Sequence, residues 1–141
     1  MSISGPSETL VPETKEGIKK KILIVEDDNS FSSRLERWMT GFGYQVYTAT
    51  NEQEALEMLK THNPDLVTLD GNFPKTRNGE IIETLGLETA VTMEKIRPEL
   101  IITMISSSSL KYKERGISKN TVLSTATGLK DHLESLFKET L

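Results

Sequence analysis

Three clusters of oxygen-bearing side chains stand directly after apolar runs in this chain of 141 residues. Glu26 and Asp27 follow the first run, Asp70 follows another, and Ser106 follows a third. Carboxylate oxygens are ligands that suit Mg²⁺. A carboxylate beside such an ion can also attack phosphorus and form an acyl phosphate, while a nearby hydroxyl donates to a phosphoryl oxygen. These residue types indicate Mg²⁺-dependent phosphoryl chemistry if the fold brings them together.

The composition argues against several other kinds of site and partner. The absence of cysteine excludes disulfides, iron–sulfur clusters, thiolate zinc sites and cysteine nucleophiles, and two histidines make a histidine-rich metal site improbable. A net charge of −4 provides no basic surface for nucleic acid. No apolar run approaches the roughly 18–20 residues of a membrane span. We therefore expect a globular, cytoplasmic protein that contacts neither nucleic acid nor membrane.

Five apolar runs of strand length alternate with helical patterns along the chain. The predicted strands are Ile22–Val25, Tyr44–Thr48, Leu66–Leu69, Leu100–Ile105 and Val122–Leu123. Five helices are predicted. The first begins at a cap on Ser30 or Asn29, and the second begins at a capping pair of Asn51 and Glu54. The other three span Gly79–Arg97, with Gly86 weakening the middle, Leu110–Arg115 and Lys130–Leu141. Strands that alternate with helices predict an α/β fold with a parallel sheet covered by helices on both faces. In such a fold the ligand site lies at the carboxyl ends of the strands, where the acidic residues stand.

The chain divides into two unequal parts by composition. Residues 1–19 are rich in small and polar side chains and contain few large apolar ones, which predicts a flexible tail. Residues 20–141 contain all the predicted elements and are expected to form one domain.

The stretches Ile22–Asp28 and Pro64–Asp70, followed by Pro74, resemble the receiver domain of bacterial two-component response regulators. The resemblance extends over about Lys20–Leu141 and is looser after Pro74. It implies a flavodoxin-like, five-stranded parallel sheet of order 2-1-3-4-5 with five helices. It also implies a signalling role and no enzymatic activity. With no sequence left for an output domain, a stand-alone regulator is expected.

The resemblance also implies a role for each candidate site residue. Glu26 and Asp27 correspond to the acidic pair that binds Mg²⁺, and Asp70 corresponds to the phosphoacceptor. Asn72 stands where a backbone carbonyl completes the metal shell, and Ser106 stands at the hydroxyl that senses the phosphoryl group. The implied partners are a sensor histidine kinase or phosphotransfer protein that donates the phosphoryl group, and a downstream protein target.

One departure from the family leaves a second function open. The family has a lysine at the end of the fifth strand, whereas Val122–Ala126 offers only hydroxyl side chains in that region. The alternative is a receiver-like docking module that signals without phosphorylation. A phosphatase, a nucleotide-binding enzyme and a flavin protein are each disfavoured, because the chain has no glycine-rich phosphate loop and no nucleophile elbow.

Overall fold

The computed structural model describes residues 19–83, 85–106, 120–123 and 127–141, without the side chains of 106 and 120–123. The five strands of the main sheet are β2 (Lys21–Val25), β3 (Gln45–Ala49), β4 (Leu66–Leu69), β7 (Ile101–Ser106) and β8 (Asn120–Leu123). The helices are α1 (Asn29–Gly41), α2 (Glu52–His62), α3 (Leu85–Ile96) and α5 (Leu129–Thr140). All but Lys19 of the predicted tail, the predicted helix at Leu110–Arg115, and Ser124–Ala126 lie outside the described residues.

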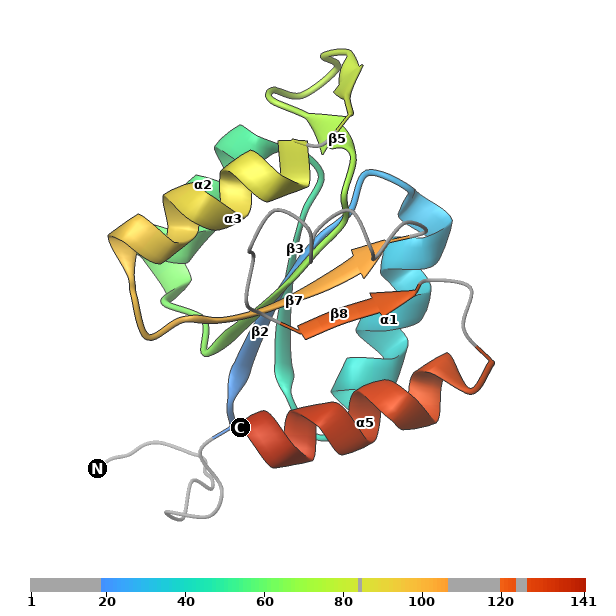
Figure 1. Cartoon of the computed structure of the whole chain (residues 1–141). Helices are drawn as coiled ribbons and strands as arrows, with labels where there is room; N and C mark the ends of the chain where they lie inside the picture. Colours follow the sequence, from blue (N-terminus) through green and yellow to red (C-terminus); the bar gives the residue numbers. More distant parts are fainter. Residues whose placement is uncertain (1–18, 84, 107–119, 124–126) are drawn as a thin grey trace, which may run out of the picture.

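The main sheet has the predicted topology. Its strand order is β3-β2-β4-β7-β8 and all four pairings are parallel, which is the order 2-1-3-4-5 in chain sequence. Helices α2 and α3 cover one face, whereas α1 and α5 cover the other (Figure 1). The prediction of a flavodoxin-like α/β fold is therefore confirmed.

The alternation of side chains along β2 explains why both faces carry helices. Leu23 and Val25 pack toward α2 and α3, and Ile22 and Ile24 pack toward α1 and α5. All four side chains are essentially inaccessible to solvent. A strand buried on both faces has to be apolar at every position, as this one is. The core thus consists of two apolar layers separated by the sheet.

The N-cap of the first helix lies one residue before the predicted cap at Asn29 and two before the one at Ser30. Asp28 is the N-cap, and its carboxylate accepts hydrogen bonds from the backbone N–H groups of Ser30 at 3.0 Å and Phe31 at 3.2 Å. The cap predicted on Ser30 or Asn29 is therefore wrong. Asp28 takes the N-cap position because its extended backbone places the carboxylate beside the N–H groups of the first turn.

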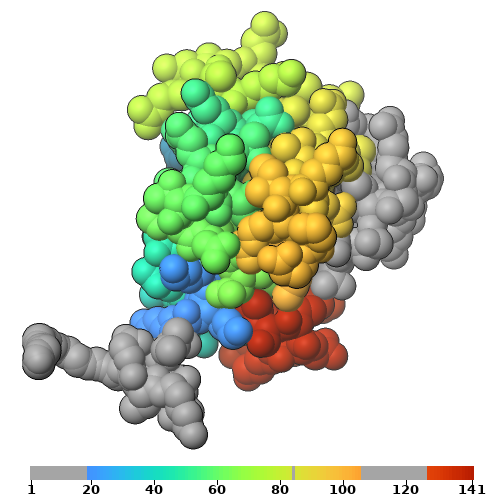
Figure 2. Space-filling view, turned by 90° about the vertical axis from the view of Figure 1, so that its left-hand side faces the viewer, coloured from blue at the N-terminus to red at the C-terminus, as the bar shows by residue number. Residues whose placement is uncertain are grey.

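A hairpin replaces the first part of the long helix that was predicted from Gly79 to Arg97. Strands β5 (Phe73–Pro74) and β6 (Ile81–Ile82) pair antiparallel, and α3 begins only at Leu85. Asn78, with a φ of 65°, takes a left-handed conformation in the turn between them. Figure 2 shows this hairpin at the top of the face formed by α2 and α3. Gly86 consequently lies in the first turn of α3 and not in the middle of a helix.

The described helices include none that could cross a membrane.

Candidate functional site

The sheet ladder continues for one residue beyond the strand ends and thereby fixes the backbone of the acidic residues. The Glu26 N–H donates to the carbonyl oxygen of Ala49 at 3.0 Å, and the Asp70 N–H donates to that of Val25 at 3.0 Å. Both residues are therefore held in register with the neighbouring strand. Their side chains leave the carboxyl edge of the sheet from positions that the backbone determines.

The three predicted acids come together at this edge. Glu26, Asp27 and Asp70 each have a carboxylate oxygen within 4.8 Å of the other two. Glu26 is only 6% exposed, whereas Asp27 and Asp70 are half-buried. The expectation that acids from two separate strands would meet is confirmed.

Electrostatic repulsion and burial act strongly on these groups. Burial of the carboxyl group, reinforced by the neighbouring Asp70 carboxylate, raises the pKa of Glu26 to about 9. Burial also raises the pKa of Asp70, although hydrogen bonds from Glu26 and from the backbone N–H groups of Gly71 and Asn72 oppose this shift. The Gly71 N–H lies 2.7 Å from Asp70 Oδ1. Three charged carboxylates are therefore an unfavourable arrangement without a cation among them.

The donor set fits a hard divalent cation. Every candidate ligand is a carboxylate, and the oxygens are close enough together for one ion to contact all three. A bound divalent ion would also relieve the repulsion that raises the pKa values of Glu26 and Asp70. These observations match Mg²⁺ better than a transition metal that prefers nitrogen or sulfur ligands.

The remaining two predicted residues occupy the same edge. Asn72 follows Asp70 by two residues, and its backbone N–H bonds to the Asp70 carboxylate. Ser106 ends β7, one residue beyond Ile105, which lines the same pocket as Asp70. The roles predicted for the Asn72 carbonyl and the Ser106 hydroxyl stay predictions.

A pocket of about 350 Å³ opens beside Asp70. Its lining consists of Glu26, Asp28, Ser30, Phe31, Arg34, Asp70 and Ile105. Neither Arg34 nor Ser30 was predicted to belong to the site. Their common position follows from the helix period, since residues 30 and 34 are four apart and lie on one side of α1.

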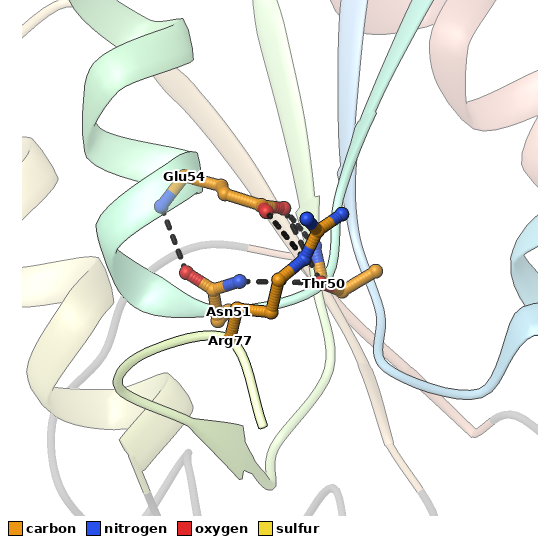
Figure 3. Close-up of polar contacts among 4 residues, drawn as sticks. All are labelled: Thr50, Asn51, Glu54 and Arg77. Atoms are coloured by element: carbon orange, nitrogen blue, oxygen red, sulfur yellow. Dashed lines mark hydrogen bonds and ion pairs between the residues drawn. The ribbon is translucent and has the colours of Figure 1, made fainter. Parts of the chain in front are cut away.

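A second pocket, of about 410 Å³, is lined by residues from α1, from the loop before α2 and from the hairpin, with Asp27 among them. The hairpin is tied to α2 by two contacts. The Gln53 N–H donates to the Lys75 carbonyl oxygen at 2.9 Å, and Arg77 Nε lies 3.8 Å from Glu54 Oε2. Figure 3 shows Arg77 reaching Glu54, which also accepts hydrogen bonds from Thr50. The acidic cluster therefore lies between a pocket on the α1 side and one that the hairpin helps to form.

Gly86 permits the close approach of α3 to the acidic residue. A β-carbon at this position would lie 2.2 Å from the backbone oxygen of Asp70, and the Gly86 N–H donates to the Gly71 carbonyl oxygen at 3.0 Å. Sequence reasoning treated this glycine only as a weak point in a helix. The signal that it missed is the need for a residue without a side chain where two backbones touch.

A family model and several curated proteins match this chain. The model described as response regulator receiver domain matches residues 22–122. The chain is 40% identical over 76 residues to a probable transcriptional regulator, ycf27, of Porphyra purpurea, and 38% identical over 68 residues to the alkaline phosphatase synthesis transcriptional regulatory protein PhoP of Bacillus subtilis. These matches cover 54% and 48% of this chain but 31% and 28% of the relatives. The chain thus spans about a third of the length of these relatives.

Solved structures with the same fold were also found. A CheY-like response regulator receiver domain from Methanospirillum hungatei superposes with a TM-score of 0.72 at 22% identity, covering 87% of this chain and 94% of that one. The response regulator TrrA of Thermotoga maritima, in complex with Mg²⁺ and beryllium fluoride, has a TM-score of 0.72 at 27% identity. That match covers 86% of this chain and 99% of TrrA.

Proposed function

This chain belongs to the response regulator receiver domain family, and from that membership we propose that Asp70 accepts a phosphoryl group from a histidine kinase or phosphotransfer protein. A receiver domain is a signalling module of two-component systems. The observation that carries the proposal is the meeting of Glu26, Asp27 and Asp70 within 4.8 Å at the carboxyl edge of the sheet.

The chemistry begins with an Asp70 carboxylate oxygen that attacks the phosphorus of a phosphohistidine. A bond forms between that oxygen and phosphorus while the bond from phosphorus to the imidazole nitrogen breaks and leaves its electron pair on the ring. The Gly71 N–H donates to Asp70 Oδ1 at 2.7 Å and so helps to orient the carboxylate for the attack. The chain's contribution is the orientation of this nucleophile in a half-buried site.

Mg²⁺ would be held by Glu26, Asp27, Asp70 and the backbone carbonyl of Asn72, and when bound it would neutralise negative charge on the transferring group. The TrrA structure, which contains Mg²⁺ and beryllium fluoride, supports this assignment by similarity. Ser106, at the end of β7, is proposed to donate its hydroxyl to a phosphoryl oxygen.

The output is proposed to be a change in surface that a downstream protein recognises. No nucleic-acid or membrane contact is proposed for this chain, whose formal charge is −4. The location proposed is the cytoplasm, where a kinase could reach Asp70.

The test is to incubate the protein with Mg²⁺ and acetyl phosphate and to measure its mass. We expect a gain of one phosphoryl group that hydroxylamine removes, and we expect Asp70→Asn to abolish it. Asp131→Asn, which changes an exposed acid of α5, is the matched control and should label like the unmodified protein. Labelling that survives in Asp70→Asn would contradict the proposal.

One sequence observation favours a second candidate function. The residues after β8 include no lysine before position 130, so the chain lacks the cation that the family has there. The second candidate is a docking module that binds its partner without phosphorylation. It predicts no mass gain with acetyl phosphate, and equal partner binding by the unmodified protein and Asp70→Asn.

A further inference from the structure

The first two turns of α1 form one wall of the Asp70 pocket. Ser30, Phe31 and Arg34 all line it, together with Glu26 and Asp70. Among the described residues that line this pocket, Arg34 is the only one with a positive charge. Asp70 and Arg34 thus line the same pocket.

Within the described part of the chain, Arg34 has no carboxylate at ion-pair distance. Its guanidinium group instead lies over the ring of Phe31, whose centroid is 6.0 Å from the guanidinium carbon. Arg77, on the hairpin side of the acidic cluster, differs because Glu54 already pairs with it. Arg34 is exposed and therefore available to a new anion, whereas Arg77 is engaged.

An anion on Asp70 would create the need for such a cation. After transfer, the Asp70 carboxylate has become an acyl phosphate, whose two negative charges and those of Glu26 and Asp27 exceed what one divalent ion balances. Arginine binds phosphate oxygens through two parallel N–H donors, and these charge-assisted hydrogen bonds are stronger than those between neutral groups. The segment 120–129 contains no lysine or arginine that could provide the charge from β8 or the residues after it.

We propose that Arg34 binds the phosphoryl group on Asp70 and takes, from α1, the part that a lysine after the fifth strand has in the family. This inference rests on the proposed function, because it concerns the group that Asp70 accepts. It makes the first helix, and not the fifth strand, the element that holds the phosphoryl group. Arg34 should therefore increase the affinity of the site for a doubly charged phosphoryl group or its fluoride analogue, without increasing its affinity for the metal ion alone.

The test compares two ligands of the full chain by isothermal titration calorimetry. Mg²⁺ alone reports on the acidic cluster, and beryllium fluoride in saturating Mg²⁺ reports on the phosphoryl position. Arg34→Ala should lower the affinity for beryllium fluoride by at least about tenfold, the loss expected for a charge-assisted contact. Its affinity for Mg²⁺ should stay equal or rise, because the variant removes a positive charge near the cation.

Two further variants make the comparison specific. Arg34→Lys should recover part of the affinity for beryllium fluoride, since it keeps the charge but loses the paired donors. Arg77→Ala removes the same side chain from the opposite side of the acidic cluster, and it should change both affinities by less than about twofold. Because Arg34 and Arg77 are both exposed, neither substitution should disturb the core.

Each contrary result points to a different error. If Arg34→Ala binds beryllium fluoride as tightly as the unmodified protein does, Arg34 does not contact the phosphoryl group. Equal losses for Mg²⁺ and beryllium fluoride would assign Arg34 a structural role and also overturn the inference. If the unmodified protein binds neither ligand, the proposed function itself is wrong.

Discussion

Gly86 is the residue at which helix α3 directly contacts the backbone of Asp70, with no room for a side chain between them. Because a β-carbon there would lie 2.2 Å from the Asp70 carbonyl oxygen, any other residue has to push the two segments apart. The contact atom is backbone, so no side-chain rotation can relieve the clash. The position of the proposed phosphoacceptor therefore depends on a residue that has no functional group.

Gly86→Ala should lower the free energy of unfolding by about 1–3 kcal/mol, the usual cost of an overpacked site, despite the better helix propensity of alanine. It should also slow the labelling of Asp70 by acetyl phosphate. Urea unfolding and mass spectrometry measure the two effects. Gly41→Ala is the matched control, because nothing lies within 4 Å of a β-carbon at position 41 in helix α1. That variant should change stability by no more than about 1 kcal/mol, and an equally small effect of Gly86→Ala would show that the backbones can separate freely.

The sequence identifies some of these residues and misses others for physical reasons. Glu26 and Asp70 end apolar runs, so their meeting follows from the parallel sheet alone. The cap on Asp28 was missed because Asp28, Asn29 and Ser30 are all good capping residues and only the backbone angles decide among them. Arg34 was missed because the helical period gives the side of α1 on which it lies but not that this side borders the pocket beside Asp70.

At the scale of elements, the hairpin β5–β6 is the feature that the sequence did not predict. The segment after Gly79 has the apolar spacing of a helix, and nothing local excludes one. The hairpin instead depends on contacts with distant residues, namely the burial of Phe73 and the hydrogen bond from Gln53 to Lys75. Tertiary contacts of this kind override a local helical pattern. The strands and the other described helices were predictable because their apolar patterns are local.

The start of α2 gives a prediction about pH. Glu54 accepts hydrogen bonds from the backbone N–H of Thr50 at 3.1 Å and from its hydroxyl at 3.2 Å. The backbone hydrogen bond from Thr50 is the main reason that the pKa of Glu54 lies below its ordinary value of 4.5. A lowered pKa stabilises the fold fully above the unfolded-state pKa, and this contribution is lost as pH falls through the folded-state pKa.

Glu54→Gln should therefore be less stable than the unmodified protein at about pH 7, and the difference should shrink as the pH falls below about 4. Thermal melts over this range measure the difference. For Glu57→Gln, which changes an exposed acid of the same helix, the difference in melting temperature from the unmodified protein should stay the same over this pH range. A difference between Glu54→Gln and the unmodified protein that is independent of pH would contradict the assignment.

At the scale of the whole molecule, the acidic cluster couples ion binding to folding. Unfolding separates Glu26 and Asp27 from Asp70, so Mg²⁺ should bind the folded state alone and stabilise it. At ten times the dissociation constant the gain is about 1.4 kcal/mol, which raises the melting temperature of a chain of this size by roughly 3–6 °C.

Asp27→Asn should melt higher than the unmodified protein without metal, because one repelling charge is gone, and should respond little to Mg²⁺. Differential scanning calorimetry at constant ionic strength measures both effects. Sodium chloride at equal ionic strength is the control for screening. A chloride effect as large as that of Mg²⁺ would mean that screening, and not a specific site, explains the stabilisation.

The last prediction concerns the path by which a phosphoryl group on Asp70 affects the rest of the molecule. A ligand shifts a conformational equilibrium only by its difference in affinity for the two states. With Arg34 as the one positively charged side chain among the described residues that line the Asp70 pocket, and no lysine directly after β8, that difference should arise mainly at α1. Apart from residues 70–72, which hold the ligand directly, backbone amide shifts caused by beryllium fluoride, after subtraction of those caused by Mg²⁺ alone, should therefore be larger in residues 26–35 than in β8. Arg34→Ala should reduce the shifts in α1. Shifts in β8 as large as those in α1 would mean that another residue has replaced the missing lysine at the end of the fifth strand.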